Sequence, residues 1–267
     1  MPALCQCGFY SESLRKCVSV NVIVPQNSKS NIGVQNLQSD KKLFPVIYLL
    51  HGLSDDQSIW MRRTSIELFA AAYECIIVMP DGGRSFYRNM ASGALYKDFI
   101  AKDLPDFIES TFPAERNREN RFICGLSMGG YGALAIGLEM PDRYAKIAAF
   151  SSVADIQYFS KNLSPVEKKS IFGDIENLIG TEQTFGFVDQ RTAANVKDGH
   201  GRAIIVAIKA EHVLRNLGRG HHTLTLSQLF QRKKLITICG RLLKQLLLGG
   251  PLHLRAQLCH GACRVAT

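Results

Sequence analysis

The chain has 267 residues, of which 46% are hydrophobic and 21% charged, which fits one α/β domain, or one domain plus an appendage, with a real core. No uninterrupted apolar run is long enough to span a bilayer, and the first residues show no basic region followed by an apolar one. We therefore expect no secretory signal and a cytoplasmic location, while the net charge of +9 raises the question of nucleic-acid binding.

Segments typical of strands and helices alternate through the first 150 residues. Apolar or β-branched runs predict five strands, at 17–24, 44–50, 75–79, 122–124 and 145–150. Helical spacing of apolar residues predicts helices over 58–73 and 98–112, and a third helix after the strand at 122–124. Buried strands that alternate with helices predict a doubly wound, mostly parallel sheet.

The most informative motif follows the predicted strand at 122–124. That strand leads into Gly125-Leu-Ser-Met-Gly129, and a run long enough for a helix comes next. In the order strand, turn, helix, this pattern indicates a nucleophile elbow, whose sharp turn lifts the serine hydroxyl above the sheet edge. Glycine is needed at both ends because side chains there would collide with the neighbouring strand and helix. We expect Ser127 to be the nucleophile and Met128 N–H to be one donor to an oxyanion.

A second oxyanion donor is expected from a loop after an early strand. The sequence His51-Gly-Leu53 follows the predicted strand at 44–50, so Leu53 N–H is the candidate. Pro45-Val-Ile-Tyr-Leu-Leu-His-Gly-Leu-Ser-Asp-Asp, Trp60 and Ile77-Val-Met-Pro-Asp, taken with the elbow, resemble the esterase D family. The resemblance is strongest to the small bacterial tributyrin-type acyl esterases, relatives of S-formylglutathione hydrolase, and covers about residues 18–178.

This resemblance implies an α/β-hydrolase fold and a small acyl ester or thioester as substrate, cleaved through an acyl-enzyme on Ser127. It also implies the Leu53 and Met128 amides as the oxyanion hole, and no cofactor. The eight cysteines are scattered without two matched pairs, so we expect no metal site either.

His51 precedes the nucleophile, whereas the order in this fold is serine, acid, histidine. We therefore interpret His51 as a structural part of the oxyanion loop rather than as the base. Trp60 and Tyr131 are interpreted as packing residues rather than substrate contacts.

The acid and the histidine of a catalytic triad lack their family motifs in this chain. Members of the family carry them in Gly-Thr-Glu-Asp-like and Thr-His-Glu-Trp-like turns, and neither turn is present. Three acids follow the elbow too closely, namely Asp142, Asp155 and Asp174. The later acids, which stay open as candidates, are Asp189, Asp198 and Glu211. The histidines, of which none is assigned as the base, are His200, His212, His221, His222, His253 and His260.

The positive charge is confined to the last third of the chain. Residues 1–183 carry 19 Lys and Arg against 20 Asp and Glu, a net charge of −1, and residues 184–267 carry 13 against 3, a net charge of +10. We therefore divide the chain into an α/β-hydrolase core, 1–183, and a basic, atypical or incomplete C-terminal segment, 184–267. That segment is either divergent or read out of frame, and the abrupt change favours the second explanation. Its strand candidates are 203–208 and 235–239, and 242–248 is a helix candidate.

Two functions other than hydrolysis stay open. The first is a catalytically impaired hydrolase-fold protein that lacks the triad acid and histidine and acts as a binding protein or has no function. The second is nucleic-acid binding through Arg232-Lys-Lys234, which rests on charge alone, without interleaved aromatic residues, so that a solvated surface is the better interpretation. The sequence leaves acyl-chain preference and oligomeric state open.

Overall fold

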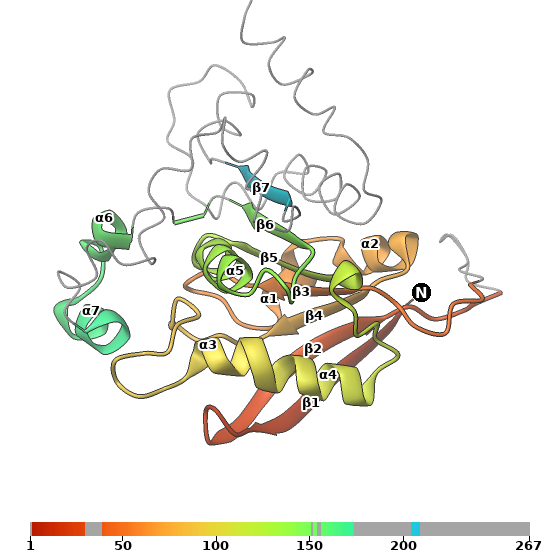
Figure 1. Ribbon diagram of the computed structural model, residues 1–267, viewed down its shortest axis with the longest axis horizontal. Coiled ribbons are helices and arrows are strands. Elements are labelled where there is room, and N and C mark those ends of the chain that lie inside the picture. Colours follow the sequence, from red (N-terminus) through yellow and green to blue (C-terminus); the bar gives the residue numbers. More distant parts are fainter. Residues whose placement is uncertain (1, 30–38, 151, 154–155, 174–203, 209–267) are drawn as a thin grey trace, which may run out of the picture.

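The computed structural model describes residues 2–29, 39–150, 152–153, 156–173 and 204–208. These residues form one seven-stranded sheet with the order β1-β2-β4-β3-β5-β6-β7 (Figure 1). The strands are β1 (Ala3–Ser11), β2 (Lys16–Val24), β3 (Val46–Leu50), β4 (Ile76–Pro80), β5 (Arg121–Leu126), β6 (Lys146–Phe150) and β7 (Ile204–Ile208).

The centre of the sheet is parallel, as the alternation of strands and helices predicts. Strand β3 pairs in parallel with both β4 and β5, and β6 pairs in parallel with β5 and β7. The hairpin β1–β2 is antiparallel and joins β4 in antiparallel pairing. The predicted α/β-hydrolase fold with a mostly parallel sheet is confirmed. Strand β1 is an addition that the sequence pattern does not predict.

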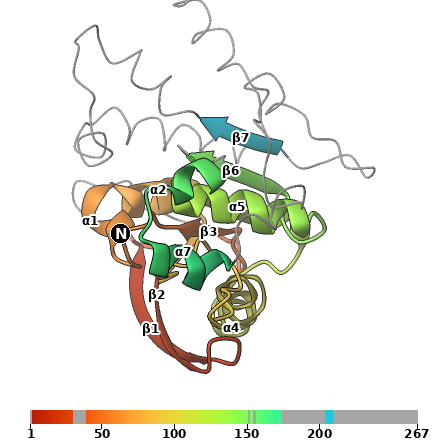
Figure 2. The same ribbon diagram turned by 90° about the vertical axis from the view of Figure 1, so that its left-hand side faces the viewer.

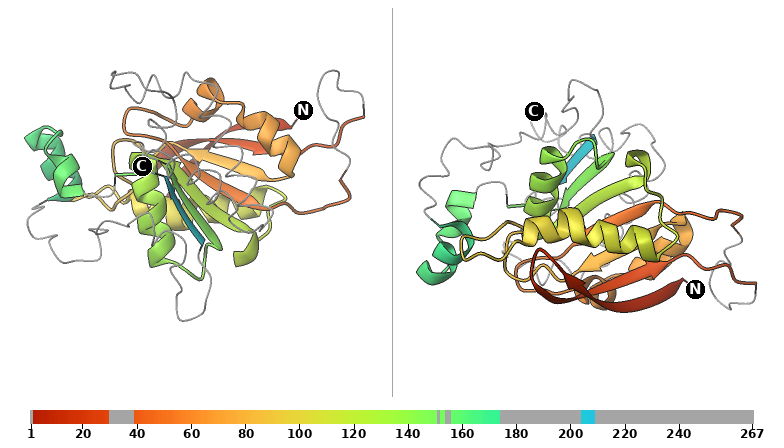
Figure 3. Two further views of the ribbon diagram at one scale, coloured as in Figure 1. Left: turned by 90° about the horizontal axis from the view of Figure 1, so that it is seen from above. Right: turned by 60° about the horizontal axis from the view of Figure 1, so that its bottom comes forward.

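Helices cover both faces of this sheet. The helices are α1 (Ile59–Arg63), α2 (Ile66–Tyr73), α3 (Tyr96–Asp98), the π-helix η1 (Phe99–Asp103), α4 (Leu104–Thr111), the short 3-10 helix η2 (Arg118–Asn120), α5 (Met128–Glu139), α6 (Ile156–Ser160) and α7 (Pro165–Phe172). Of these, α6 and α7 lie to one side of the sheet (Figure 1). Figures 2 and 3 show α1 and α2, in orange, on the face of the sheet opposite to the green α5.

Alternation along the strands divides the core into two layers. Along β3, Ile47 and Leu49 belong to the cluster that also holds Trp60 and Ile66 from α1 and α2. Tyr48 lies between them in sequence but belongs to the other cluster, which includes residues of η1, α4 and α5. Since both faces are covered, β3 is buried along its whole length, as its continuous apolar run predicts.

Two predicted helices differ from their expected form. The segment 58–73 is not one helix, because α1 ends at Arg63 and α2 begins only at Ile66. The segment 98–112 includes the π-helical turn η1, which ends at Asp103, and Pro105 follows in the first turn of α4. A proline ring collides with the carbonyl four residues earlier and offers it no N–H. That carbonyl, of Ala101, instead accepts a hydrogen bond from the guanidinium of Arg143.

The strand candidate at 203–208 is confirmed as β7, which lies beside β6 with Ile208 opposite Phe150. The candidates at 235–239 and 242–248 lie outside the described residues. No helix in the described ranges is long and apolar enough to cross a membrane.

Candidate active site

Ser127 occupies the junction between β5 and α5. Its backbone has φ 54° and ψ −112°, a conformation with positive φ that a residue other than glycine rarely adopts. Three backbone hydrogen bonds hold this turn, and the longest is donated by Val153 N–H to the carbonyl of Ser127 at 3.4 Å. Ser127 N–H donates to the carbonyl of Phe150 at 2.9 Å, and Tyr131 N–H donates to the carbonyl of Ser127 at 3.0 Å. The half-buried serine therefore stands at the carboxyl edge of the sheet, held by β6 on one side and by the first turn of α5 on the other.

The glycines that flank Ser127 allow three backbone segments to meet. A Cβ at Gly125 would lie 2.3 Å from the carbonyl oxygen of Gly129, and a Cβ at Gly129 would lie 2.4 Å from the carbonyl oxygen of Leu50. Real Cβ atoms do not approach backbone atoms so closely, so α5 reaches the ends of β5 and β3 only because both positions lack side chains. The reason predicted for these glycines is thus supported by the geometry.

The loop at residues 51–54, named the oxyanion loop after the role expected of it, lies against Ser127, the candidate nucleophile. The register pairs Leu50 with Gly125, so both turns leave the sheet at the same edge. A Cβ at Gly52 would stand 4.0 Å from Cβ of Ser127. The candidate donors Leu53 and Met128 therefore belong to the two turns that meet at this edge.

Within the described residues, neither candidate N–H group donates a hydrogen bond to a backbone carbonyl. Met128 is the first residue of α5, so its N–H has no acceptor inside the helix. Among the turn and loop hydrogen bonds of the described residues, none is donated by Leu53 N–H. The N-terminus of α5 adds a positive dipole end beside Ser127, which favours a developing negative charge there.

His51 is buried and fully engaged within the oxyanion loop. Its Nε2 accepts the N–H of Gly82 at 2.8 Å, and its Nδ1 lies 2.7 Å from the carbonyl oxygen of Gly52. An acceptor at Nε2 requires the ring proton on Nδ1, which then donates to Gly52. Asp81 Oδ1 lies 3.6 Å from Nε2, beyond hydrogen-bonding distance, and accepts the N–H of Gly83. Neither ring nitrogen is left to take a proton from Ser127, which agrees with a structural role for His51.

The segment after β4, here named the 81–88 loop, supports the oxyanion loop. The hydroxyl of Tyr87 donates to the carbonyl oxygen of His51 at 3.0 Å. Burial raises the pKa of Tyr87 well above its ordinary value, so its hydroxyl stays protonated and able to donate. The Tyr87 ring fits between two glycines, because a Cβ at Gly82 or Gly132 would lie 2.3 or 2.6 Å from it.

Sequence reasoning assigned no role to the 81–88 loop and missed its contribution to the site. The available signal was the glycine pair Gly82-Gly83 directly after a buried strand. In addition, Phe86 and Tyr87 both have φ 54°, so two consecutive bulky residues lie in the left-handed region. Such strain persists only where the surrounding structure holds it, and it often marks a functional site.

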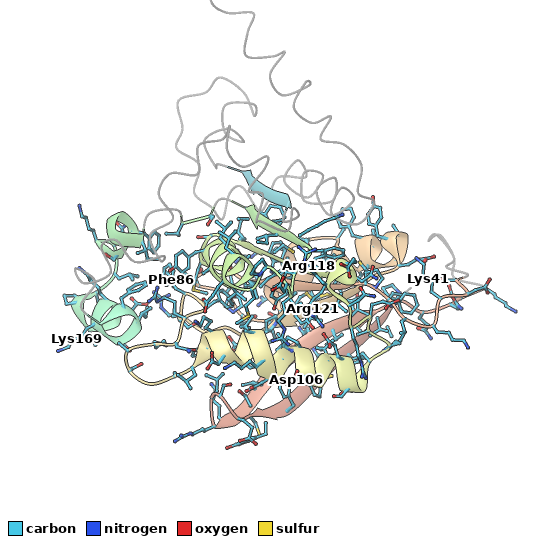
Figure 4. All side chains as sticks on the ribbon, viewed as in Figure 1. Lys41, Phe86, Asp106, Arg118, Arg121 and Lys169 are labelled. Atoms are coloured by element: carbon cyan, nitrogen blue, oxygen red, sulfur yellow. The ribbon has the colours of Figure 1, made fainter. Side chains whose placement is uncertain are left out.

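The two aromatic residues weighed as packing residues are both buried. Trp60 is 3% exposed in the layer of α1 and α2, and Tyr131 is 1% exposed on α5. The Tyr131 ring packs against Phe86, and its hydroxyl accepts a hydrogen bond from Arg88 at 3.0 Å. Figure 4 places Phe86 between α5 and the pair α6 and α7.

The early acid Asp142 lies far from Ser127. It is exposed in the turn between the end of α5 and the start of β6, which is the opposite edge of the sheet from Ser127. The remaining candidates for the acid and the base lie outside the described residues, and they are Asp155, Asp174, Asp189, Asp198, Glu211, His200, His212, His221, His222, His253 and His260. No group of three or more potential metal ligands occurs within the part of the chain that the structure describes.

Comparisons with known proteins point to one family. The esterase family model, described as "Putative esterase", matches residues 11–210. An acetyl esterase from Caldicellulosiruptor saccharolyticus is 30% identical over 190 residues, which cover 68% of this chain and 71% of that protein.

Solved structures also resemble the chain over most of its length. FphF, the fluorophosphonate-binding serine hydrolase F of Staphylococcus aureus, has a TM-score of 0.70 and 25% identity and covers 92% of this chain and 98% of its own. The S-formylglutathione hydrolase FrmB of S. aureus has a TM-score of 0.69 and 24% identity, with coverages of 92% and 99%. An S-formylglutathione hydrolase from Agrobacterium tumefaciens has a TM-score of 0.59 and 18% identity, with coverages of 92% and 95%. The two S-formylglutathione hydrolases share less than 25% of their residues with this chain, so their likeness shows the fold alone.

Proposed function

The chain belongs to the esterase family of α/β-hydrolases, and from this premise we propose that it cleaves short-chain acyl esters or thioesters through an acyl-enzyme on Ser127. One observation carries the proposal. Ser127 has the strained backbone of a nucleophile elbow and stands beside the turns that contain the Leu53 and Met128 amides. A serine held in this way is suited to acyl transfer.

In the proposed reaction, Ser127 Oγ attacks the carbonyl carbon of the substrate while its proton passes to a base. The carbonyl oxygen becomes an oxyanion, and the Leu53 and Met128 N–H groups stabilise it, at about 3 kcal/mol for each well-placed donor. Collapse of this intermediate releases the alcohol or thiol, which takes up the proton. Water then attacks the acyl-enzyme, releases the carboxylic acid and restores the serine hydroxyl.

The base comes from outside the described residues. His51 is the one histidine within the described ranges, and both its ring nitrogens are engaged. The proposal therefore takes the base from the six histidines at or beyond position 200. It assigns none of them, because none stands in a family motif.

The relatives support a small acyl group and a serine nucleophile. One relative is an acetyl esterase, and two of the similar structures are S-formylglutathione hydrolases. The substrate in the latter name contains a one-carbon acyl group. FphF binds fluorophosphonates as a serine hydrolase. These names favour an acetyl or formyl ester or thioester as the substrate class.

A fluorophosphonate probe and p-nitrophenyl acetate test the proposal together. The wild-type chain should become labelled on Ser127, as located by peptide mass spectrometry, and should hydrolyse the ester. The Ser127→Ala variant should lose both properties. Ser110→Ala is a matched control, because Ser110 is an exposed serine of α4 whose hydroxyl donates to the carbonyl of Asp106 in its own helix, away from the oxyanion loop, so the label should stay on Ser127. A wild-type chain that neither labels nor turns over would contradict the proposal.

A catalytically impaired hydrolase-fold protein is the second candidate, and the missing acid and histidine turns favour it. Removing the base lowers kcat by about 10⁶-fold. The oxyanion hole alone then leaves a rate roughly 10³–10⁴ times that of the uncatalysed reaction in water. The division into a core, 1–183, and a basic segment, 184–267, belongs to this proposal. Strand β7 and the family match to residue 210 favour grouping at least residues 204–208 with the core.

Amide hydrogen exchange separates the two candidates independently of catalysis. If residues 204–208 form β7 of a complete hydrolase, their amides should exchange about as slowly as those of residues 146–150 in β6. Rapid exchange of 204–208 beside slow exchange of 146–150 would favour the impaired protein.

A further inference from the structure

The guanidinium of Arg84 joins the oxyanion loop to helix α7. Its Nη1 donates to the carbonyl oxygen of Leu53 at 3.2 Å, and its Nε donates to Oε1 of Glu167 at 2.6 Å. We propose that Arg84 is a positioning residue that sets the direction of the Leu53 N–H and couples it to α7. This inference rests on the proposed role of Leu53 as an oxyanion donor.

The reason lies in the two peptide planes that flank Cα of Leu53. The first plane contains the Leu53 N–H and the Gly52 carbonyl, whose oxygen is held by His51 Nδ1 at 2.7 Å and by Asp55 N–H at 3.2 Å. The second plane contains the Leu53 carbonyl, which Arg84 holds. Because each peptide is planar, the held carbonyl oxygens restrain both planes and the dihedrals of Leu53 that join them, so the first plane, which carries the N–H, is less free to rotate when Arg84 holds the second. An oxyanion donor must point at the place where charge develops, so this direction affects the rate.

Glu167 is held in place by its helix. It is the third residue of α7, and its N–H donates to the side-chain oxygen of the N-cap residue Ser164 at 3.2 Å. The last residue of α7, Phe172, packs on Phe86 of the 81–88 loop, with ring centroids 5.3 Å apart. Helix α7 is thus anchored beside the loop that carries Arg84, and the Glu167 carboxylate holds the guanidinium at Nε while Nη1 holds the Leu53 carbonyl.

An ordinary surface ion pair would have a different effect from a positioning contact. Arg84 is an exposed side chain, 53% accessible, and exposed pairs add little to fold stability. If Arg84 only formed a surface ion pair, its loss would change neither the stability of the fold nor the rate of hydrolysis. If it positions the Leu53 amide, its loss should lower kcat while KM stays nearly constant, since the oxyanion forms only in the transition state.

Three single variants test this in the full chain with p-nitrophenyl acetate. Arg84→Met removes both contacts while keeping a long side chain, and Glu167→Gln removes only the ionic partner of the guanidinium. Lys97→Met is the matched control, because it removes the Lys97–Glu139 pair of 2.8 Å, which joins α3 to the end of α5 that is remote from Ser127.

We expect Arg84→Met to lower kcat about threefold to tenfold with KM within about twofold, as the loss of one orienting hydrogen bond allows. Glu167→Gln should lower kcat less, about twofold to threefold, and Lys97→Met should match the wild type. Equal kcat values for Arg84→Met and Lys97→Met would overturn the proposal.

If the wild-type chain is inactive, that result counts against the proposed function and not against the role of Arg84. A structural measurement then tests the role of Arg84 on its own. Amide hydrogen exchange should become faster in a peptide covering residues 50–56 in Arg84→Met and, to a smaller degree, in Glu167→Gln. It should be unchanged in that peptide in Lys97→Met. Unchanged exchange in Arg84→Met would show that Arg84 does not hold the loop.

Discussion

The backbone N–H of Gly82 donates a hydrogen bond to Nε2 of His51 across 31 positions of sequence, at 2.8 Å. This contact fixes the tautomer of a buried ring, so that the Nδ1 proton faces the Gly52 carbonyl. The histidine therefore acts on the peptide that carries the Leu53 amide, and it does so as a neutral donor.

Replacement of His51 should affect orientation rather than proton transfer. His51→Ala is expected to lower kcat by about tenfold to a hundredfold, since one oxyanion donor loses its support. It should also lower the free energy of unfolding by about 1–3 kcal/mol, because buried partners are left unsatisfied. Steady-state kinetics across pH 5–9 and urea denaturation measure the two effects. The acid limb of the pH–rate profile should persist in the variant, and its disappearance would mean that His51 is the base after all.

The strained backbone of Ser127 predicts a difference between two inactive variants. Ser127→Ala keeps a Cβ in the positive-φ conformation, whereas Ser127→Gly removes the strain. After the entropic disadvantage of glycine in the unfolded chain is allowed for, Ser127→Gly should be about 1 kcal/mol more stable than Ser127→Ala. Urea denaturation followed by tryptophan fluorescence compares them, and a Gly variant less stable than the Ala variant would argue against strain at this turn.

The close approach of α5 to β3 predicts that a single methyl group at Gly129 is costly. Gly129→Ala should lower the free energy of unfolding by about 1–3 kcal/mol, because its Cβ would lie 2.4 Å from the carbonyl oxygen of Leu50. Gly8→Ala serves as the control, since its Cβ would meet its nearest atom only at 3.9 Å. Thermal and urea unfolding should show the control within about 0.5 kcal/mol of the wild type. Equal stability of the two variants would contradict the contact.

Cys75 should be protected from alkylation until the protein unfolds. Burial raises the pKa of its thiol from 9.0 to about 12. Iodoacetamide at pH 8 should label the exposed Cys17 in the native protein, and Cys75 only in denaturant. The unfolded thiol ionises first as the pH rises, so the contribution of Cys75 to stability is complete below pH 9 and is lost between pH 9 and about 12. The pH dependence of unfolding in this window should be weaker in Cys75→Ala, and an identical slope would contradict the shifted pKa.

The parallel centre of the sheet could be predicted because fully buried strands appear as continuous apolar runs. The predicted strands at 44–50 and 145–150 match β3 and β6 within two residues. Strand β1 was missed, since it contains no β-branched residue and alternates half-buried cysteines with exposed residues. The helix prediction over 58–73 was wrong as a single element, because apolar periodicity continues across the break at Thr64 and Ser65.

The two motifs of the site could also be predicted from the sequence, because each lies within a few consecutive residues. The contacts that support them from the 81–88 loop could not. Ser127 and the loop with Leu53 carry recognisable residues at fixed spacing, and the structure brings these two segments to one edge of the sheet. Their supports come from Gly82, Arg84 and Tyr87, which contact residues more than thirty positions earlier. Such contacts are set by the path of the folded chain, and no local pattern records them.

Several groups at this site are main-chain amides, including the N–H of Gly82 that holds His51 and the two proposed oxyanion donors. A point substitution cannot delete a backbone amide, except by proline, and can only move it. The position of the Gly82 amide relative to His51 therefore depends more on the length of the 81–88 loop than on the identity of its exposed side chains. Insertions and deletions there would misalign the amide that meets His51, while many exchanges of exposed side chains would leave it in place.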